Sequence, residues 1–423
     1  MYVHGIRKLF RFPGYVVAKI SMTDDLAQVN LRRDKRCRLA CPACGATMGR
    51  NRVKLQTARD LPLGTALRVV LVYEGIQGRC SSCGIYVTIH PPGIDDHARA
   101  TRRLQEFVSR LARFLPLSHI EEVVPVDDAT AFRWDKAILT QSLPPPDLEN
   151  LRILLIDEKA IRKHHGYVTL VMNGETGELL HMAEGKKKAS LQSFFDTLSQ
   201  EQKQRIVAVG MDRAGAYREV VKAELPDADI VFDKFHLIAN YHAVIDAIRR
   251  AEWRKASGED KDVIKGQRYN LFRNPANRTA AQTQSLMALL HMNRNLAVAY
   301  ILKDGLRKLW DYQRIQAARK YLAKWCRWAA VSGVDALRVF ARSLLRAKEE
   351  VVNYCKHRIT TARLEAFNNT ISRLILRACG MKDMDYLFLK LRQESLPCDP
   401  PKYTDHRSRS ARTAPPGTPC RCS

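Results

Sequence analysis

Residues 151–184 read LRILLIDEKAIRKHHGYVTLVMNGETGELLHMAE, and this stretch decides the fold of the chain. The apolar run 151–156 is bounded by turn signals, as a buried strand is, and a pair of carboxylates beginning at Asp157 follows it directly. Residues 167–173 and 178–183 predict two further strands, joined by the turn NGETG. The stretch therefore predicts a three-stranded meander whose first strand ends in two acids.

The segment after the meander continues with alternating helices and strands. We expect a helix over 190–204, a strand over 205–212 that ends in Asp212, a helix over 216–225 and a strand over 230–233. The order βββαβαβ is that of the ribonuclease-H-like fold, in which the first and fourth strands are parallel neighbours. Asp157 and Asp212 are therefore expected at the same edge of one sheet.

The charge of the chain favours a polyanionic partner. Its 423 residues contain 70 Lys and Arg against 44 Asp and Glu, which gives a net charge of +26. Nucleic acid is the first partner to consider, and an anionic membrane surface is the rival. The sequence contains no 18-residue apolar run and no N-terminal signal segment, so we expect a cytoplasmic protein that binds no membrane.

Two cysteine motifs of equal spacing predict a zinc site. CPACG at 41–45 and CSSCG at 80–84 each offer two thiolates from one tight turn, and the trailing glycine suits such a turn. A strand over 66–73 can bring the motifs together. The predicted ligands of one structural zinc ion are Cys41, Cys44, Cys80 and Cys83, with Cys37 as a substitute. The alternative is a set of unrelated cytosolic thiols.

Helical periodicity begins after the second cysteine motif. Leu104–Leu115 has an apolar face, and Ser118–Glu121 reads as a capping box that opens a short helix. Asp127 or Asp128 can cap a third helix over 129–139, which carries Arg133, Trp134 and Lys136. The pattern is typical of a helix-turn-helix whose second helix enters the major groove, with Arg133 and Lys136 as its DNA contacts, although a small helical bundle has the same pattern.

A third acid is needed if Asp157 and Asp212 are to hold metal. Two Mg²⁺ ions about 4 Å apart require several oxygen ligands, one of them bridging. Glu365 is the candidate, because it lies in a predicted amphipathic helix with Asn368 three residues later on the same edge. The alternative is a solvated glutamate paired with Arg363 or Arg373.

Basic residues occur near the acids and in the long segment between them. Arg162, Lys163, Lys186 and Lys187 are candidates to hold DNA against the acids, although a solvated charge run has the same composition. The segment 238–353 is predicted to be helical, with four tryptophans among many cations. Such aromatics stack on unpaired bases in some proteins, but core packing explains them more often.

Three segments resemble the acid-bearing blocks of the ISL-three family of bacterial insertion-sequence transposases. They are LLIDEKAIRKHHGYVTLVMNGETGELL, VAVGMDRAGAYREVVKAELPDADIVFDKFHLI and RLEAFNNTISRLILRACG. The most specific signal is the DKFH at Asp233–His236, and the cysteine motifs resemble the zinc-binding domain of that family. The likeness extends to about residue 395. Two departures are Ala366, where the family has glycine, and Asn173, where an aspartate is expected.

The resemblance implies an α/β ribonuclease-H-like core with a large all-helical insertion, preceded by a zinc-binding domain and a helix-turn-helix. The expected parts are a zinc-binding domain at 1–92, a helix-turn-helix at 93–143, a linker at 144–150, the core at 151–237 and 354–395, the insertion at 238–353 and a disordered basic tail at 396–423.

The same resemblance implies a DNA transposase of the DDE type. Its triad maps onto Asp157, Asp212 and Glu365, which would bind two Mg²⁺ ions, with Mn²⁺ as a substitute, and Asp233, His236 and Asn368 would support them. The expected partners are transposon ends and target DNA, and two ends brought together imply at least a homodimer. Two alternatives remain, an inactive transposase-derived regulator that only binds DNA, and a ribonuclease-H-like nuclease that cuts without joining.

Overall fold

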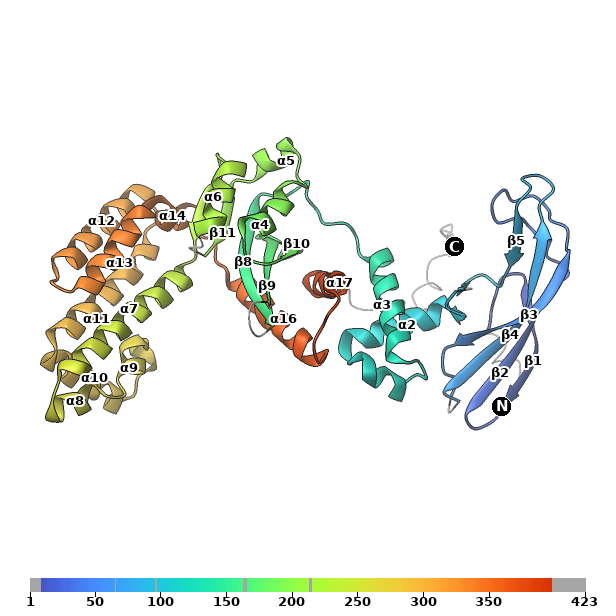
Figure 1. Ribbon diagram of the computed structural model, residues 1–423, viewed down its shortest axis with the longest axis horizontal. Coiled ribbons are helices and arrows are strands. Elements are labelled where there is room, and N and C mark those ends of the chain that lie inside the picture. Colours follow the sequence, from blue (N-terminus) through green and yellow to red (C-terminus); the bar gives the residue numbers. More distant parts are fainter. Residues whose placement is uncertain (1–8, 65, 96, 163–165, 213–214, 398–423) are drawn as a thin grey trace, which may run out of the picture.

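The computed structural model describes residues 9–64, 66–95, 97–162, 166–212 and 215–397. The chain is elongated, with an N-terminal sheet at one end, a mixed sheet in the middle and a bundle of helices at the other end (Figure 1). Lys163 and residues 398–423, which make up most of the tail that the sequence predicts to be disordered, lie outside the described residues.

The N-terminal sheet has seven strands in the order β1-β2-β4-β3-β7-β6, with β5 also paired to β4. The strands are β1 (Tyr15–Met22), β2 (Leu26–Arg33), β3 (Arg52–Asp60), β4 (Arg68–Arg79), β5 (Tyr86–Ile89), β6 (Ile94–Asp95) and β7 (Ala100–Thr101). Alternate residues of β2 and β4, among them Val29 and Leu71, are fully buried in its core. The sheet extends past the predicted domain end at residue 92, because β7 pairs with β3.

A pair of helices follows the N-terminal sheet. These are α2 (Arg102–Phe114) and α3 (Asp128–Ser142), with the short 3₁₀ helix η1 (Leu117–Glu122) between them. Asp127 caps α3 by accepting a hydrogen bond of 2.8 Å from the Thr130 amide. The predicted capping box at Ser118 is wrong, because Pro116 takes the N-cap position of η1 and places Ser118 inside the helix.

A buried polar cluster joins α3 to the last helix, α17 (Met384–Ser395). The Asp135 carboxylate is fully buried and accepts hydrogen bonds from Ser109 (2.6 Å), Tyr386 (2.6 Å) and Lys390 (3.0 Å). Nearby, Lys136 forms an ion pair of 2.7 Å with Asp383, the N-cap residue of α17. Helix α3 is therefore fixed to the C-terminal part of the chain on one of its faces.

The central sheet has five strands in the order β10-β9-β8-β11-β12. Its strands are β8 (Ile153–Arg162), β9 (Gly166–Asn173), β10 (Leu179–Glu184), β11 (Ala208–Met211) and β12 (Asp229–Phe232). The expectation that the first and fourth strands are parallel neighbours is confirmed, since β8 pairs with β11 in parallel. The prediction that the first strand ends before Asp157 is wrong, because hairpin pairing with β9 carries β8 on to Arg162.

Helices cover both faces of the central sheet. They are α4 (Lys188–Phe195) and α6 (Gly215–Glu224) on one side and α16 (Ala362–Arg377) with α17 on the other. Helix α5 (Gln200–Arg205), which follows α4, has no buried residue. The single helix predicted over 190–204 is two helices. The first helix ends at Phe195 with Asp196 as its C-cap, and Ser199 starts the second, since it forms a capping box with Gln202.

The insertion consists of helices and connects β12 to α16. Its elements are α7 (Lys234–Lys255), α8 (Gly258–Ile264), α9 (Arg268–Phe272), η2 (Pro275–Asn277), α10 (Ala280–Met292), α11 (Arg294–Arg307), η3 (Lys308–Asp311), α12 (Ile315–Val331), α13 (Asp335–Arg346), α14 (Lys348–Val352) and α15 (Tyr354–His357). It shares one apolar core with the central sheet. Within the described residues, no helix has the length and apolarity that a membrane span needs.

The four tryptophans of the insertion divide into two kinds. Trp325 and Trp310 are buried, with exposed fractions of 1% and 8%, and Trp325 packs edge-on against Tyr241. Trp253 and Trp328 are exposed, and each lies beside a lysine ammonium, Lys261 in the first case. Core packing thus explains half of the tryptophans that the sequence left open.

Candidate functional site

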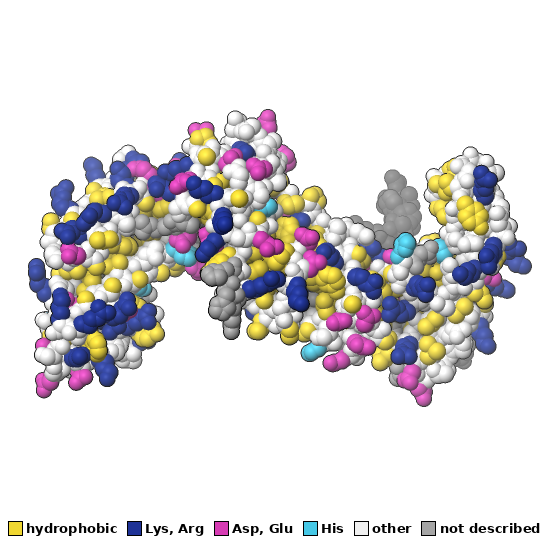
Figure 2. Space-filling model, in the orientation of Figure 1, with side chains coloured by type: hydrophobic (Ala, Val, Ile, Leu, Met, Phe, Trp, Pro, Cys, Tyr) yellow, Lys and Arg dark blue, Asp and Glu magenta, His cyan; other side chains and the backbone are white. Residues whose placement is uncertain are grey.

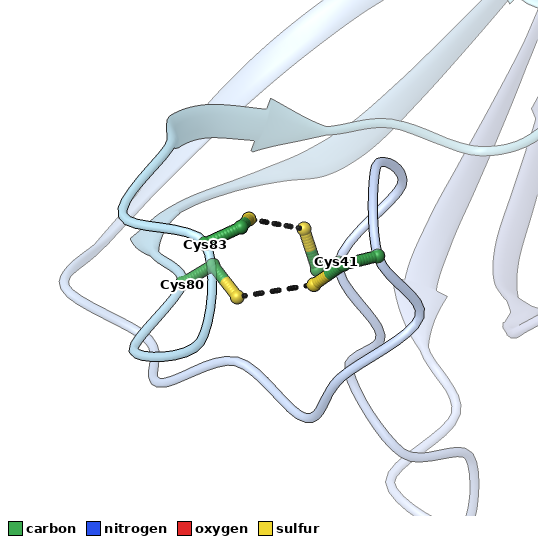
Figure 3. Close-up of side chains that lie close together, drawn as sticks. Cys41, Cys80 and Cys83 are labelled. Atoms are coloured by element: carbon green, nitrogen blue, oxygen red, sulfur yellow. Dashed lines mark hydrogen bonds between the residues drawn. The ribbon is translucent and has the colours of Figure 1, made fainter.

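The four cysteines of the two CxxCG motifs lie together (Figure 3). Cys41 and Cys44 come from the loop between β2 and β3, and Cys80 and Cys83 follow β4 directly. All four sulfur atoms lie within 4.8 Å of one another. The glycine that follows each motif has a φ of +73°, a conformation in which only glycine avoids strain, so the trailing glycines of the sequence motif have a structural cause.

The distances between the sulfurs fit a tetrahedral zinc ion. Four ligands at about 2.3 Å from zinc would lie about 3.8 Å apart. The Sγ atoms of Cys41 and Cys83 are 3.7 Å apart, and those of Cys44 and Cys80 are 3.6 Å apart. The backbone amide of Cys83 helps to lower the pKa of the Cys80 thiol to about 6, which favours the thiolate that a metal needs. Cys37, the substitute ligand, lies outside this cluster.

The first two acids of the predicted triad lie at neighbouring points of the central sheet. Ile156 of β8 pairs with Met211 of β11, so the next residues along the chain are Asp157 and Asp212. Strand β11 ends at Met211 while β8 continues, which leaves this edge of the sheet open beside Asp157. His236, in the first turn of α7, places its Nδ1 atom 3.8 Å from the Asp212 carboxylate.

Asp157 is half-buried and held in place by two hydrogen bonds. The Asn368 side chain donates to one carboxylate oxygen (2.7 Å), and the Glu158 amide donates to the other (2.8 Å). Burial raises the pKa of Asp157, while the hydrogen bond from Asn368 acts in the opposite direction. The nearby Asp212 carboxylate also raises this pKa, and a cation between two such groups would remove their repulsion.

Among the described residues, Glu365 does not form a cluster of close ligand atoms with these two acids. It is an exposed residue in the first turn of α16, and in the described part of the chain its carboxylate contacts neither Arg363 nor Arg373. Among the described residues, the four cysteines are the only group of three or more His, Cys, Asp or Glu with ligand atoms this close together. The residue of α16 that contacts Asp157 is Asn368, one turn after Glu365.

Asp233, the first residue of the DKFH motif, ties the insertion to α16. Its carboxylate is buried, caps α7 through the Phe235 amide, and accepts hydrogen bonds from the hydroxyl and the amide of Thr361. Thr361 is the N-cap residue of α16, the helix that carries Glu365 and Asn368. The Thr361 hydroxyl makes no capping hydrogen bond to α16 but donates to Asp233, a distant contact that no local sequence pattern predicts.

The predicted DNA-binding residues have different surroundings. Arg133 is exposed on α3, whereas the Lys136 ammonium donates a hydrogen bond to the Asp383 carboxylate. Arg162 donates to the carbonyl of Met381 (2.9 Å). Lys186 and Lys187 are exposed, and the Lys186 ammonium lies 4.1 Å from the Tyr167 ring. Lys186 lies near the acids, because its charge opposes the burial that raises the pKa of Glu158, the residue after Asp157.

We expect one zinc ion per chain, bound at the four cysteines. Replacing Cys41 by serine should abolish zinc binding, because the closed four-thiolate site loses a ligand, and hydrogen exchange should rise at residues 39–48 and 80–87. These segments pack in a small core separate from the one formed by β1 to β4, so those four strands should exchange as before. Metal analysis and hydrogen exchange check this.

The matched control is Cys37→Ser, which changes an exposed thiol of the same region and should keep the zinc. Equal zinc content in the Cys41→Ser protein and the unchanged protein would refute the site.

Comparison with known proteins identifies the family. The family model described as transposase, of the ISL-three type, matches residues 154–391. The transposase for insertion sequence element IS1001 of Bordetella parapertussis is 32% identical over 386 residues, which are 90% of this chain and 95% of that protein. The transposase for insertion sequence element IS1557 of Mycobacterium tuberculosis is 27% identical over 372 residues, 81% of this chain and 82% of that protein.

The match covers more than half of the chain and includes Asp157 in β8, Asp212 directly after β11, and α16. The chain belongs to the ISL-three family of DDE transposases of bacterial insertion sequences.

Proposed function

We propose that this protein binds the ends of its insertion sequence, cleaves phosphodiester bonds there and joins the freed 3′-OH ends to target DNA. The observation that carries the proposal is the parallel pairing of β8 with β11, which supports a shared metal-binding edge for Asp157 and Asp212. The strand order β10-β9-β8-β11-β12, with only β9 antiparallel to its neighbours, also supports a ribonuclease-H-like core.

Two Mg²⁺ ions, or Mn²⁺ in their place, would be held by Asp157, Asp212 and Glu365. When bound, the ions would offset the phosphate charge and lower the pKa of a bound water. Asn368 fixes the orientation of Asp157 by its hydrogen bond. Glu365 precedes Asn368 by three residues, so about 4.5 Å of helix rise separates the two positions.

The proposed reaction has two steps. Water attacks a phosphodiester at the transposon end, its O–P bond forms as the bond to the 3′ oxygen breaks, and a proton moves to that oxygen. The freed 3′ oxygen then forms a bond to a phosphorus of the target, the bond from that phosphorus to the target 3′ oxygen breaks, and the proton lost by the attacking hydroxyl passes to the leaving oxygen. Exposed Lys186 and Lys187 would hold the DNA strands near the acids by contacts to phosphate.

The first test replaces each acid by its amide. Asp157→Asn, Asp212→Asn and Glu365→Gln should each lower cleavage and strand transfer by about 1000-fold, because a neutral amide is a poor metal ligand that leaves the developing charge unbalanced. Binding to transposon ends should persist, since fewer negative charges face the phosphates. Cleavage assays on labelled end fragments and binding assays measure the two effects.

Glu175→Gln is the matched control, because Glu175 is an exposed acid of the same region that holds no metal in this proposal. Strand transfer by the Glu365→Gln protein would refute the third acid. Cleavage without joining in the unchanged protein would indicate a nuclease, and binding without either step would indicate a regulator.

A second test concerns the link between Asp233 and Thr361. Thr361→Val keeps the shape of the side chain but removes the hydroxyl that donates to Asp233, so α16 should lose part of its fixed position. We expect cleavage to fall by about 10- to 100-fold and the Mg²⁺ concentration for half-maximal activity to rise, as for other groups that orient metal ligands. Thr361→Ser should restore both, because it restores the hydroxyl.

Thr360→Val is the control for this test, since it makes the same change at the preceding residue. A Thr361→Val protein with unchanged Mg²⁺ dependence would show that the link does not position the acids.

The third test concerns the proposed major-groove contact of α3. Arg133→Ala should weaken binding to the transposon ends by about 1–3 kcal/mol and leave binding to random DNA almost unchanged. Arg110→Ala, which removes an exposed arginine from α2, should affect both DNAs little. If the Arg133→Ala protein loses equal affinity for both DNAs, Arg133 contacts phosphate and not a base.

A further inference from the structure

The helical insertion carries more than half of the net positive charge of the chain. Residues 234–357 contain 24 Lys and Arg against 10 Asp and Glu, a net charge of +14 out of +26. None of the basic residues that the sequence analysis assigned to DNA binding lies in this segment. The insertion thus has an unassigned excess of cations, and their placement on the helices decides what they can bind.

The cations gather on the outer side of two adjacent helices. Helix α12 exposes Lys320, Lys324 and Arg327, and α13 exposes Arg338, Arg342 and Arg346. We refer to these six residues as the α12–α13 face. Figure 2 shows many Lys and Arg side chains over this part of the insertion.

The arrangement of these charges is costly for an isolated helix. Arg338, Arg342 and Arg346 follow one another at intervals of four residues, so like charges stack along one side of α13, and each such pair destabilises a helix by roughly 0.2–0.5 kcal/mol. Asp335 pairs with Arg338, but within the described residues no acid pairs with Arg342 or Arg346.

Helix α7 of the same insertion shows the contrasting pattern. There Arg249 and Arg250 pair with Asp246, and Lys255 pairs with Glu252. Ordinary solvated helices balance their charges in this way. The unbalanced α12–α13 face is therefore better explained by an anionic partner than by solvation.

We propose that the α12–α13 face binds the phosphate backbone of duplex DNA, a proposal that rests on the proposed function for the identity of the polyanion. Packed helices lie about 8–10 Å apart, so the cations form two rows at a separation comparable to the major groove width of roughly 12 Å. Two such rows can reach the phosphate strands on either side of one groove.

The apolar residues among the cations favour DNA over a membrane. Trp328 is 43% exposed, but its ring centre lies 4.9 Å from the Lys324 ammonium. This contact holds the ring against the protein and away from a lipid surface. On α13, Val339 and Leu345 are exposed but each lies beside an arginine of the face, and Val331 is exposed at the end of α12, whereas a membrane-binding face needs a continuous apolar stripe. The face therefore offers charge without a surface for lipid insertion.

The test measures how binding of a labelled 30-base-pair duplex of random sequence depends on salt. Each lost phosphate contact reduces the slope of log Kobs against log[KCl] by about 0.9. The full chain with Lys320→Gln, Arg342→Gln and Arg346→Gln should therefore show a slope shallower by about 2.7. Arg342→Lys with Arg346→Lys keeps the charge and should keep the slope.

The matched control removes three exposed cations from α7 by Arg250→Gln, Arg254→Gln and Lys255→Gln. Its slope should stay within about one unit of the unchanged protein, because the same net charge is lost away from the α12–α13 face. Equal slopes for the two triple variants would overturn the proposal, because DNA binding would then depend on the net positive charge of the chain and not on the α12–α13 face. A thermal unfolding midpoint within the range of the unchanged protein confirms that each variant folds.

Two further outcomes separate this proposal from others. If the α12–α13 triple variant keeps its salt slope for DNA but loses binding to phosphatidylserine vesicles, the partner of this face is an anionic membrane surface and not DNA. The assay contains no cleavage step, so inactive acids would refute the proposed chemistry while leaving the slope measurement and its conclusion intact.

Discussion

The parallel pairing of β8 with β11 is the constraint on which the rest of the structure depends. Its register puts Met211 opposite Ile156, so Asp157 and Asp212 follow at neighbouring strand positions. Both strands are buried on their two faces, which requires helices on each side of the sheet. One of these helices, α16, brings Asn368 onto Asp157, although the two residues are separated by most of the core and the whole insertion. The acid edge is thus a product of sheet register and helix packing together.

Asp233 holds the two ends of the helical insertion together at the edge of the core. Its buried carboxylate meets the start of α7 and the start of α16, so the outgoing and returning ends of the insertion are held at one point. The insertion also continues the apolar core of the sheet, through α14 and β12. A buried carboxylate is costly unless its oxygens are satisfied, and the hydrogen bonds from Thr361 and Phe235 satisfy them. The same contacts therefore stabilise the core and orient the helix next to the acids.

The buried contact between Asp135 and Lys390 plays a comparable part between α3 and α17. Removing one partner of such a pair typically costs about 3–5 kcal/mol, because the other charge stays buried without compensation. The contact fixes one face of α3 to the C-terminal part of the chain and leaves the side with Arg133 exposed. Helix α3 and the acid edge are in this way parts of one connected structure.

The sequence by itself determined the local features. The spacing of CPACG and CSSCG predicts the cysteine cluster, and the order of apolar runs predicts the five strands and their acids, because turn geometry and side-chain periodicity act over a few residues. Only the tertiary structure decided which distant residues meet. It joined Asn368 to Asp157, Thr361 to Asp233, and Lys136 to Asp383. Such contacts depend on how whole helices pack on the sheet, and no short pattern encodes that packing.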